Sequence, residues 1–214
     1  MEAYIIDGLR SAVTKSKRGG FRNFRSDDLA VLVIKALMAK YPMIEPGLVD
    51  DVIVGCANPE GEQGLQIGRN ISSRALGKEV AGMTVNRYCA SGLETIASAT
   101  AKIKAGMGHI YVAGGAESMS LIPMTGYKMA PSYQAAMENV NYHVSMGATA
   151  EAVAVKYGVS REESDAFAYR SHQLAGKAIA DGKFSASIHP VEVTEVTVEN
   201  NKRKESTITV SMDD

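Results

Sequence analysis

The sequence predicts an α/β protein in which a mostly parallel sheet carries helices on both faces. Three observations indicate this class. Short apolar runs alternate with longer amphipathic runs along residues 1–118, the apolar runs show no polar face, and the 20 glycines suit tight turns between strands and helices. The 214 residues suffice for one large domain or for a domain with an appendage. Their formal net charge of −1 provides no field that attracts nucleic acid or an anionic membrane.

The alternating elements are predicted in chain order from their periodicity. Strands are expected at residues 3–7, 51–56, 81–86 and 109–118, and helices at 26–40, 63–76 and 90–106. Ser26 is the expected N-cap of the first helix. Its buried face is expected to consist of Leu29, Leu32, Val33, Ala36 and Leu37. The helix at 90–106 is expected to bury Leu93, Ile96, Ala97, Thr100 and Ile103.

After Ser118 the alternation ends, and we predict a second region at residues 119–214. Its first part is rich in Met and Tyr without a clear period, which indicates an ordered excursion. A Ser160/Glu163 capping box then opens a helix that ends at Gly182. That helix is expected to bury Phe167, Leu174, Ala178 and Ile179. Residues 189–214 alternate around a charged turn and predict a β-hairpin.

The chain has two cysteines, Cys56 and Cys89, whose spacing fits neither a disulfide framework nor a zinc site. No metal is therefore expected. The sequence contains no run of 18 apolar residues and no basic leader followed by an apolar stretch, so no membrane segment is expected. These features together predict a reducing, cytoplasmic setting.

Cys89 lies in the run VNRYCASGLETI, where a strand gives way to a helix. Backbone N–H groups at the positive end of a helix favour a thiolate and can stabilise an oxyanion on an acyl carbon. Ser91 and Gly92 occupy the opening turn of that helix, where glycine allows close approach. Free cysteine is also among the most buried residue types. The residues alone therefore leave two interpretations of Cys89 open, a buried apolar side chain and a nucleophile.

Four runs resemble the thiolases: NRYCASGLETI, AGGAESMS at 113–120, PEGEQG at 59–64 and MGATAEAVAVKYGVSREESDAFAYRSHQLA at 146–175. The resemblance implies a thiolase-like N-terminal α/β core at 1–118 and part of an inserted loop domain at 119–214. It assigns Cys89 as the nucleophile that attacks an acyl-CoA and carries the acyl group as a thioester. Coenzyme A is then a substrate, and neither a metal nor an organic cofactor is implied.

The resemblance also implies further site residues. We expect Asn86, Ser91, Gly92 and Glu117 to support the cysteine loop. We expect the substrate to contact Met146, Gly147 and His143. The biosynthetic branch carries a His-Met-Gly triplet where this chain has Ser145-Met146-Gly147, with His143 two residues early. This departure favours the 3-ketoacyl-CoA thiolases of fatty-acid breakdown over strict acetoacetyl-CoA specificity.

The resemblance covers roughly half of a family member. The activating histidine, a second cysteine and an Asn–His pair belong to the other half, and His109, His172 and His189 are expected to be structural. We therefore expect a homo-oligomer or a complementary C-terminal thiolase half as partner, with acyl-CoA and CoA as ligands and no nucleic acid. Two alternatives stay open. One is a non-catalytic fragment that binds CoA or serves in assembly, and the other is a ketoacyl-synthase-like condensing enzyme.

Overall fold

A computed structural model describes residues 2–214, which divide into two compact units. The first contains the chain up to Tyr127 together with Ser185–Asp214, and the second is Lys128–Phe184. The predicted boundary between a core at residues 1–118 and a loop domain at 119–214 stays a prediction.

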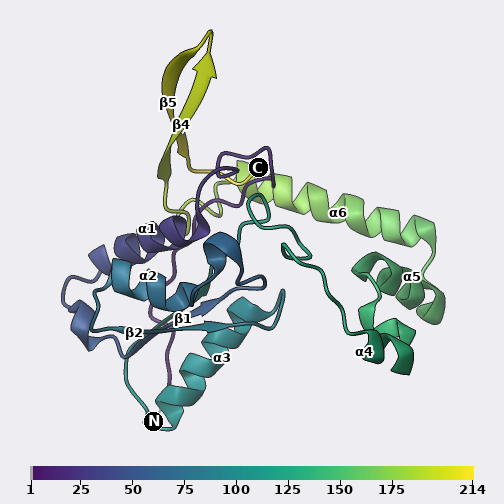
Figure 1. The fold of residues 1–214 in the computed structure, drawn as a ribbon, viewed down its shortest axis with the longest axis horizontal. Helices are drawn as coiled ribbons and strands as arrows, with labels where there is room; N and C mark the ends of the chain where they lie inside the picture. Colours follow the sequence, from purple (N-terminus) through teal and green to yellow (C-terminus); the bar gives the residue numbers. More distant parts are fainter. Residues whose placement is uncertain (1) are drawn as a thin grey trace. The chain divides into compact units, whose positions relative to one another are not determined.

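The centre of the first unit is a parallel three-stranded sheet of order β2-β1-β3 (Figure 1). Its strands are β1 (Asp51–Gly55), β2 (Ala81–Val85) and β3 (Tyr111–Gly115). All five residues of β1 are buried, as the central position of this strand requires. The register brings Gly55 opposite both Val85 and Gly115, so the three strands end together at one edge.

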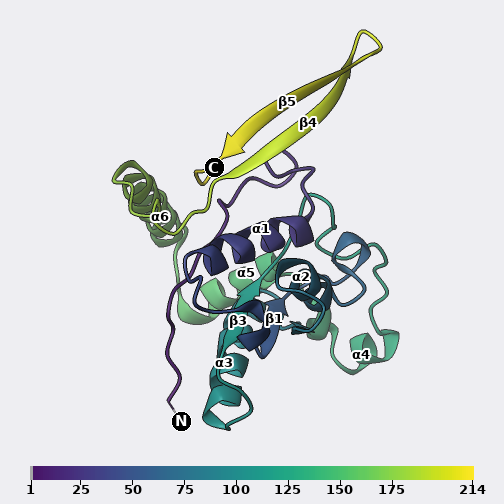
Figure 2. The same cartoon turned by 90° about the vertical axis from the view of Figure 1, so that its left-hand side faces the viewer.

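Helices cover both faces of this sheet, as predicted for an α/β fold (Figures 1 and 2). Helices α1 (Ser26–Ala39) and α2 (Ile67–Ala75) pack on one face, and α3 (Ser91–Lys104) packs on the other. The main apolar core lies on the side of α1 and α2. Its buried residues are Val31, Ile34, Val49, Val52, Val54, Cys56, Ile67, Ile71, Val80 and Ala116.

The structure corrects the expectation of a strand at residues 3–7. No strand forms there, and Tyr4, Ile5 and Ile6 are exposed. This run is apolar, but a strand also needs a neighbouring strand to bond its N–H and C=O groups. Within residues 2–214, none pairs with this run.

The predicted buried face of α3 is wrong, and that of α1 is correct only in part. Helix α1 buries Val31 and Ile34 in the core, and Leu32 is exposed, whereas the predicted residues Leu29, Val33, Ala36 and Leu37 are half-buried. Ser26 is not the N-cap of α1. Arg25 takes that position, and the Ser26 hydroxyl donates to Gln63 instead.

Helix α3 buries the small side chains of Ser91, Thr95 and Ala99, and leaves Leu93 71% exposed and Ile96 39% exposed. The close approach of α3 to β1 explains this choice, because only small side chains fit between them. A Cβ at Gly55 would lie 2.6 Å from the backbone carbon of Ser91.

The predicted helix at 63–76 is shorter than expected. It is divided into a 3₁₀ turn, η2 (Gly61–Gln63), and helix α2, with Leu65 and Gln66 in the left-handed region between them. A second 3₁₀ turn, η1 (Pro46–Leu48), precedes β1.

The second unit is helical. It consists of α4 (Tyr133–Glu138), η3 (Val140–His143), α5 (Met146–Tyr157) and α6 (Arg161–Ala180). The predicted capping box is confirmed: Glu163 N–H donates to the Ser160 hydroxyl, and the Glu163 carboxylate accepts from Ser160 N–H. The predicted buried face of α6 is wrong for Phe167 and Leu174, which are both exposed.

The predicted hairpin is confirmed as β4 (Val191–Glu199) and β5 (Lys202–Val210), which pair antiparallel and form the long ribbon in Figure 2. The base of the hairpin packs in a second core with Ala12, Phe21, Ile188, Val191, Val193 and Val210. An ion pair joins Arg10 to Asp213 beside this core, with Nη1 and Oδ1 2.7 Å apart. The hairpin is therefore fastened to the N-terminal segment.

Candidate active site

Cys89 lies in the tight connection between β2 and α3, two residues before the helix begins. Cys89 is an exposed residue. The connection closes through two backbone hydrogen bonds, from Ala90 N to Arg87 O at 3.1 Å and from Ser91 N to Tyr88 O at 3.0 Å. Tyr88 takes a φ of +47°, in the left-handed region. The chain thus reverses sharply just before the thiol, at the edge of the sheet where the parallel strands end.

Two polar side chains hold this turn. Ser91 Oγ accepts from Arg87 N at 2.9 Å and donates to Tyr88 O at 2.5 Å. Asn86 Oδ1 accepts from Tyr88 N at 2.9 Å, while Asn86 Nδ2 donates to Ala57 O at 2.9 Å. Asn86 therefore links the cysteine turn to the loop that follows β1.

The start of α3 provides backbone donors next to the thiol. The first helical hydrogen bond runs from Glu94 N to Ala90 O at 3.0 Å. Within residues 2–214, no hydrogen bond engages the backbone N–H groups of Gly92 or Leu93. Free N–H groups at a helix start suit a negative charge, such as a thiolate or an oxyanion.

The other thiol has a different environment. Cys56 is 1% exposed and lies in the main core, as expected for a structural cysteine. Burial, and then the charge of the neighbouring Glu117, raise the pKa of Cys56 to about 12. This thiol therefore stays protonated near neutral pH, and it is no candidate for the nucleophile.

Glu117 lies just after β3 and joins the ends of two strands. Its Oε2 accepts from Ala57 N at 2.6 Å, and its Oε1 accepts from Gln63 Nε2 at 2.5 Å. Ala57 is also the residue whose carbonyl binds Asn86. Glu117 thus contacts the cysteine turn only through the loop after β1.

Sequence reasoning missed Gln63, whose side chain is fully buried at the end of η2. A single glutamine in a glycine-rich loop has no periodicity that would reveal burial. The only available signal was its position in the PEGEQG run.

The three residues expected to contact substrate lie in the second unit, whereas Cys89 lies in the first. His143 ends η3, Met146 begins α5, and Ser145 caps that helix by accepting from Ala148 N. Met146 is 75% exposed. The substrate contacts of His143, Met146 and Gly147 stay a prediction.

Residues 2–214 contain neither a metal-binding cluster nor a membrane-spanning helix. Among residues 2–214, no three His, Cys, Asp or Glu side chains gather in a way that would hold a metal ion. No helix in the same range combines the length and the apolar character needed to cross a bilayer.

With this geometry in place, comparison with known proteins gives the class. The family model described as thiolase, N-terminal domain, matches residues 3–213. The chain belongs to this family. The match favours a thiolase over the ketoacyl-synthase alternative.

The similar curated proteins agree with this class. A 3-ketoacyl-CoA thiolase of Bacillus subtilis (strain 168) is 48% identical over 215 residues, which cover 100% of this chain and 55% of that protein. One of Chromohalobacter salexigens is 42% identical over 88% of this chain and 48% of its own length. One of Shewanella loihica is 37% identical over 89% and 49%. The chain spans about half the length of these relatives.

Proposed function

We propose that this chain supplies the nucleophile for acyl transfer between CoA thioesters, with Cys89 carrying the acyl group. The observation that carries the proposal is the exposed thiol of Cys89 on a braced turn at the start of α3. Its substrate is proposed to be a 3-ketoacyl-CoA, in keeping with the names of the similar thiolases.

In the degradative direction, the Cys89 sulfur attacks the 3-keto carbon of the substrate. The bond between C2 and C3 breaks, the two-carbon fragment takes a proton and leaves as acetyl-CoA, and the acyl group stays on Cys89. The thiol of a second CoA then attacks the thioester, which yields the shortened acyl-CoA and restores Cys89. Passing through the thioester divides one difficult step into two easier ones. The same steps in reverse are a Claisen condensation.

The start of α3 is proposed to stabilise the charge that develops in these steps. The N–H groups of Gly92 and Leu93 are available there, and a backbone donor aimed at an oxyanion contributes roughly 3–4 kcal/mol to catalysis. Asn86, Ser91, Gly92 and Glu117 are proposed as support for the cysteine loop. His143, Met146 and Gly147 are proposed to contact the acyl-CoA.

The proposed partner is a complementary C-terminal thiolase half, or a second copy of the chain. Two apolar surfaces support this. A groove of about 550 Å³ lies between residues 9–16, α1, the middle of β1, and β3 with the residues that follow it. On the opposite face of the sheet, Leu93 and Ile96 are exposed on α3. Apolar surface of this kind is usually covered by a partner.

Coenzyme A enters the proposal as a substrate, and no metal or organic cofactor is needed for these steps. The proposed location is the cytoplasm, because both cysteines are free and a reducing compartment keeps them so.

A second candidate function is a non-catalytic module that binds CoA or serves in assembly. Within residues 2–214, no histidine side chain forms a hydrogen bond with the cysteine turn. A base that activates the nucleophile would have to come from the partner.

Mass spectrometry separates the two candidates. The chain is incubated with acetyl-CoA or acetoacetyl-CoA, alone and with a C-terminal thiolase half, and then digested with trypsin, which isolates Cys89 in the peptide of residues 88–102. Acyl transfer predicts an acyl adduct on this peptide, which increases with the partner half and is absent in Cys89→Ser. An unmodified peptide in both mixtures would favour the non-catalytic module.

A further inference from the structure

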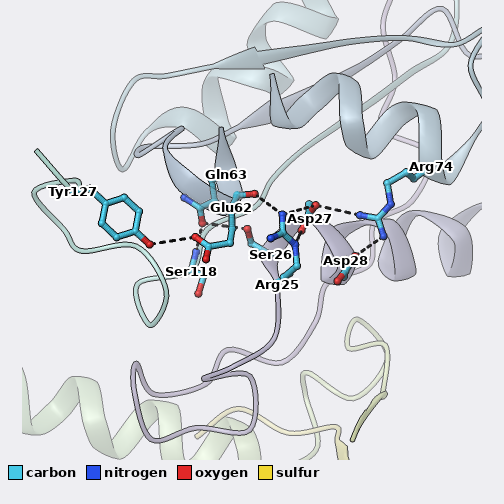
Figure 3. A network of polar contacts seen from close by, with 9 residues as sticks. All are labelled: Arg25, Ser26, Asp27, Asp28, Glu62, Gln63, Arg74, Ser118 and Tyr127. Carbon is cyan, nitrogen blue, oxygen red and sulfur yellow. Dashed lines mark hydrogen bonds and ion pairs between the residues drawn. The ribbon is translucent and has the colours of Figure 1, made fainter. Parts of the chain in front are cut away.

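Gln63 is a buried polar side chain that the proposed mechanism does not yet use. A buried amide is costly unless its donors and acceptors are paired. Here both ends are paired. Gln63 Oε1 accepts from Ser118 N at 2.6 Å and from Ser26 Oγ at 3.2 Å (Figure 3). Gln63 Nε2 donates to Asn58 O at 2.8 Å and to Glu117 Oε1 at 2.5 Å. This one side chain therefore joins the start of α1 to the loops that follow β1 and β3.

A continuous path of hydrogen bonds leads from this amide to the cysteine turn. Glu117 accepts from Gln63 at one oxygen and from Ala57 N at the other. Ala57 O accepts from Asn86, and Asn86 accepts in turn from the backbone N–H of Tyr88, the residue before the thiol. We call this path the relay.

The relay ends at a strained residue. A tyrosine at a φ of +47° costs roughly 1 kcal/mol, and it keeps this conformation only where its surroundings impose it. Asn86 bonds the N–H of Tyr88, and Ser91 bonds its carbonyl. Loosening either contact frees the turn that places Cys89 at the start of α3.

We propose that Gln63 is a positioning residue for Cys89, which acts through Glu117 and Asn86 to fix the turn that presents the thiol. The proposal rests on the acyl-transfer role proposed for Cys89. It assigns to the buried amide one specific task, which is to donate to the Glu117 carboxylate and keep its second oxygen on Ala57.

The identity of the side chain matters for this task. In Gln63→Glu, a carboxyl group would lie 2.5 Å from that of Glu117. The two groups can share a proton at low pH, and they repel once both are ionised. Glu117 would then turn away from Ala57. In the exchanged pair, Gln63→Glu with Glu117→Gln, a donor again faces an acceptor, although the bond to Asn58 is lost. The exchanged pair is thus expected to restore part of the relay.

The test measures the rate of Cys89 alkylation by iodoacetamide across pH 6–9 in the 214-residue chain, with thermal unfolding as a check of folding. We expect Gln63→Glu to slow alkylation at pH 7 about tenfold and to move the profile to higher pH. The exchanged pair is expected to recover to within about threefold of wild type. The matched control is Ser26→Ala, which removes a hydrogen bond on the other end of the amide and is expected to stay within about twofold.

If Gln63→Glu does not fold, the alkylation rate of the Asn86→Ala variant tests the relay instead. Asn86 is exposed and lies at the far end of the relay. It is expected to slow alkylation about as much as the loss of the amide would. Wild-type rates and profiles in a folded Gln63→Glu or in Asn86→Ala would overturn the proposal, as would equal slowing in Ser26→Ala.

The acyl-adduct assay separates this outcome from a failure of the proposed function. A wild-type chain that takes no acyl group, while Gln63→Glu still slows alkylation, contradicts acyl transfer and supports the relay. A wild-type chain that does take the group, with unchanged alkylation in Gln63→Glu, supports acyl transfer and contradicts the relay.

Discussion

At the scale of single residues, the two thiols of this chain differ because of where the backbone places them. Cys56 follows the central strand and lies against Ile and Val side chains of the core, whereas Cys89 lies on an exposed turn. Burial disfavours the charged form of a thiol, so the core thiol loses both access and reactivity. The positions of the two residues therefore make Cys56 a packing residue and leave Cys89 as the candidate nucleophile.

This contrast predicts selective alkylation. At pH 8 a thiol with a pKa of about 12 is ionised in about one molecule in 10⁴. We expect iodoacetamide to modify Cys89 at least about 100-fold faster than Cys56, measured from the tryptic peptides of the native chain. In denaturant the two rates should converge. Native rates within about threefold of each other would contradict the burial of Cys56.

At the scale of elements, the site depends on how closely α3 approaches β1. A Cβ built on Gly55 would lie 2.6 Å from Ser91 C and 2.9 Å from Gly92 N, which are backbone atoms that cannot turn aside. Gly92 itself has no atom from outside its own helix turn within 4 Å of the position that a Cβ would take. Packing therefore requires a glycine at position 55, whereas position 92 has room for a side chain.

These two glycines make a matched pair of variants. Gly55→Ala is expected to destabilise the fold by about 1–3 kcal/mol, because the start of α3 must move away from β1. Gly92→Ala replaces a glycine inside a helix turn and is expected to raise stability by roughly 0.5–1 kcal/mol. Chemical denaturation measures both. Equal effects of the two substitutions would contradict the close packing at Gly55.

At the scale of the first unit, the hairpin closes onto residues near the N-terminus. Asp213 accepts two hydrogen bonds from the Arg10 guanidinium, at 2.7 and 2.8 Å, and one from Val13 N at 2.8 Å. Arg10 lowers the pKa of the Asp213 carboxyl. This contact links positions that are 203 residues apart.

The lowered pKa of Asp213 predicts a stability difference that depends on pH. A carboxylate with a folded pKa below its unfolded value of about 3.9 stabilises the fold above that value and loses this effect as the pH falls. We expect Asp213→Asn to be less stable than wild type by about 1 kcal/mol at pH 7, and the difference to shrink as the pH falls below the unfolded pKa and to be lost only below the folded pKa.

Thermal unfolding of both proteins between pH 3 and pH 7 measures this difference. The control is Asp165→Asn, which removes an exposed ion pair with Arg161 on α6 and is expected to change stability by less than about 0.5 kcal/mol at any pH. A deficit of Asp213→Asn that is equally large at pH 3 and pH 7 would mean that the carboxylate charge is not its cause.

The sequence by itself determined the local features of this protein. The order of strands and helices from Ser26 to Gly115, the capping box at Ser160 and the hairpin all follow from periodicity and from signals within a few residues. The position of Cys89 between a strand and a helix is also local. Its proposed role came from the resemblance of the surrounding run to a family.

Only the tertiary structure decided which faces are buried and which residues meet across the chain. Helix α3 buries Thr95 rather than Leu93, and Gln63 comes to join Ser118 to Glu117. The apolar run at 3–7 does not become a strand, because no described neighbour bonds its backbone. Burial and hydrogen bonding of this kind depend on partners distant in sequence, and a local pattern contains no information about them.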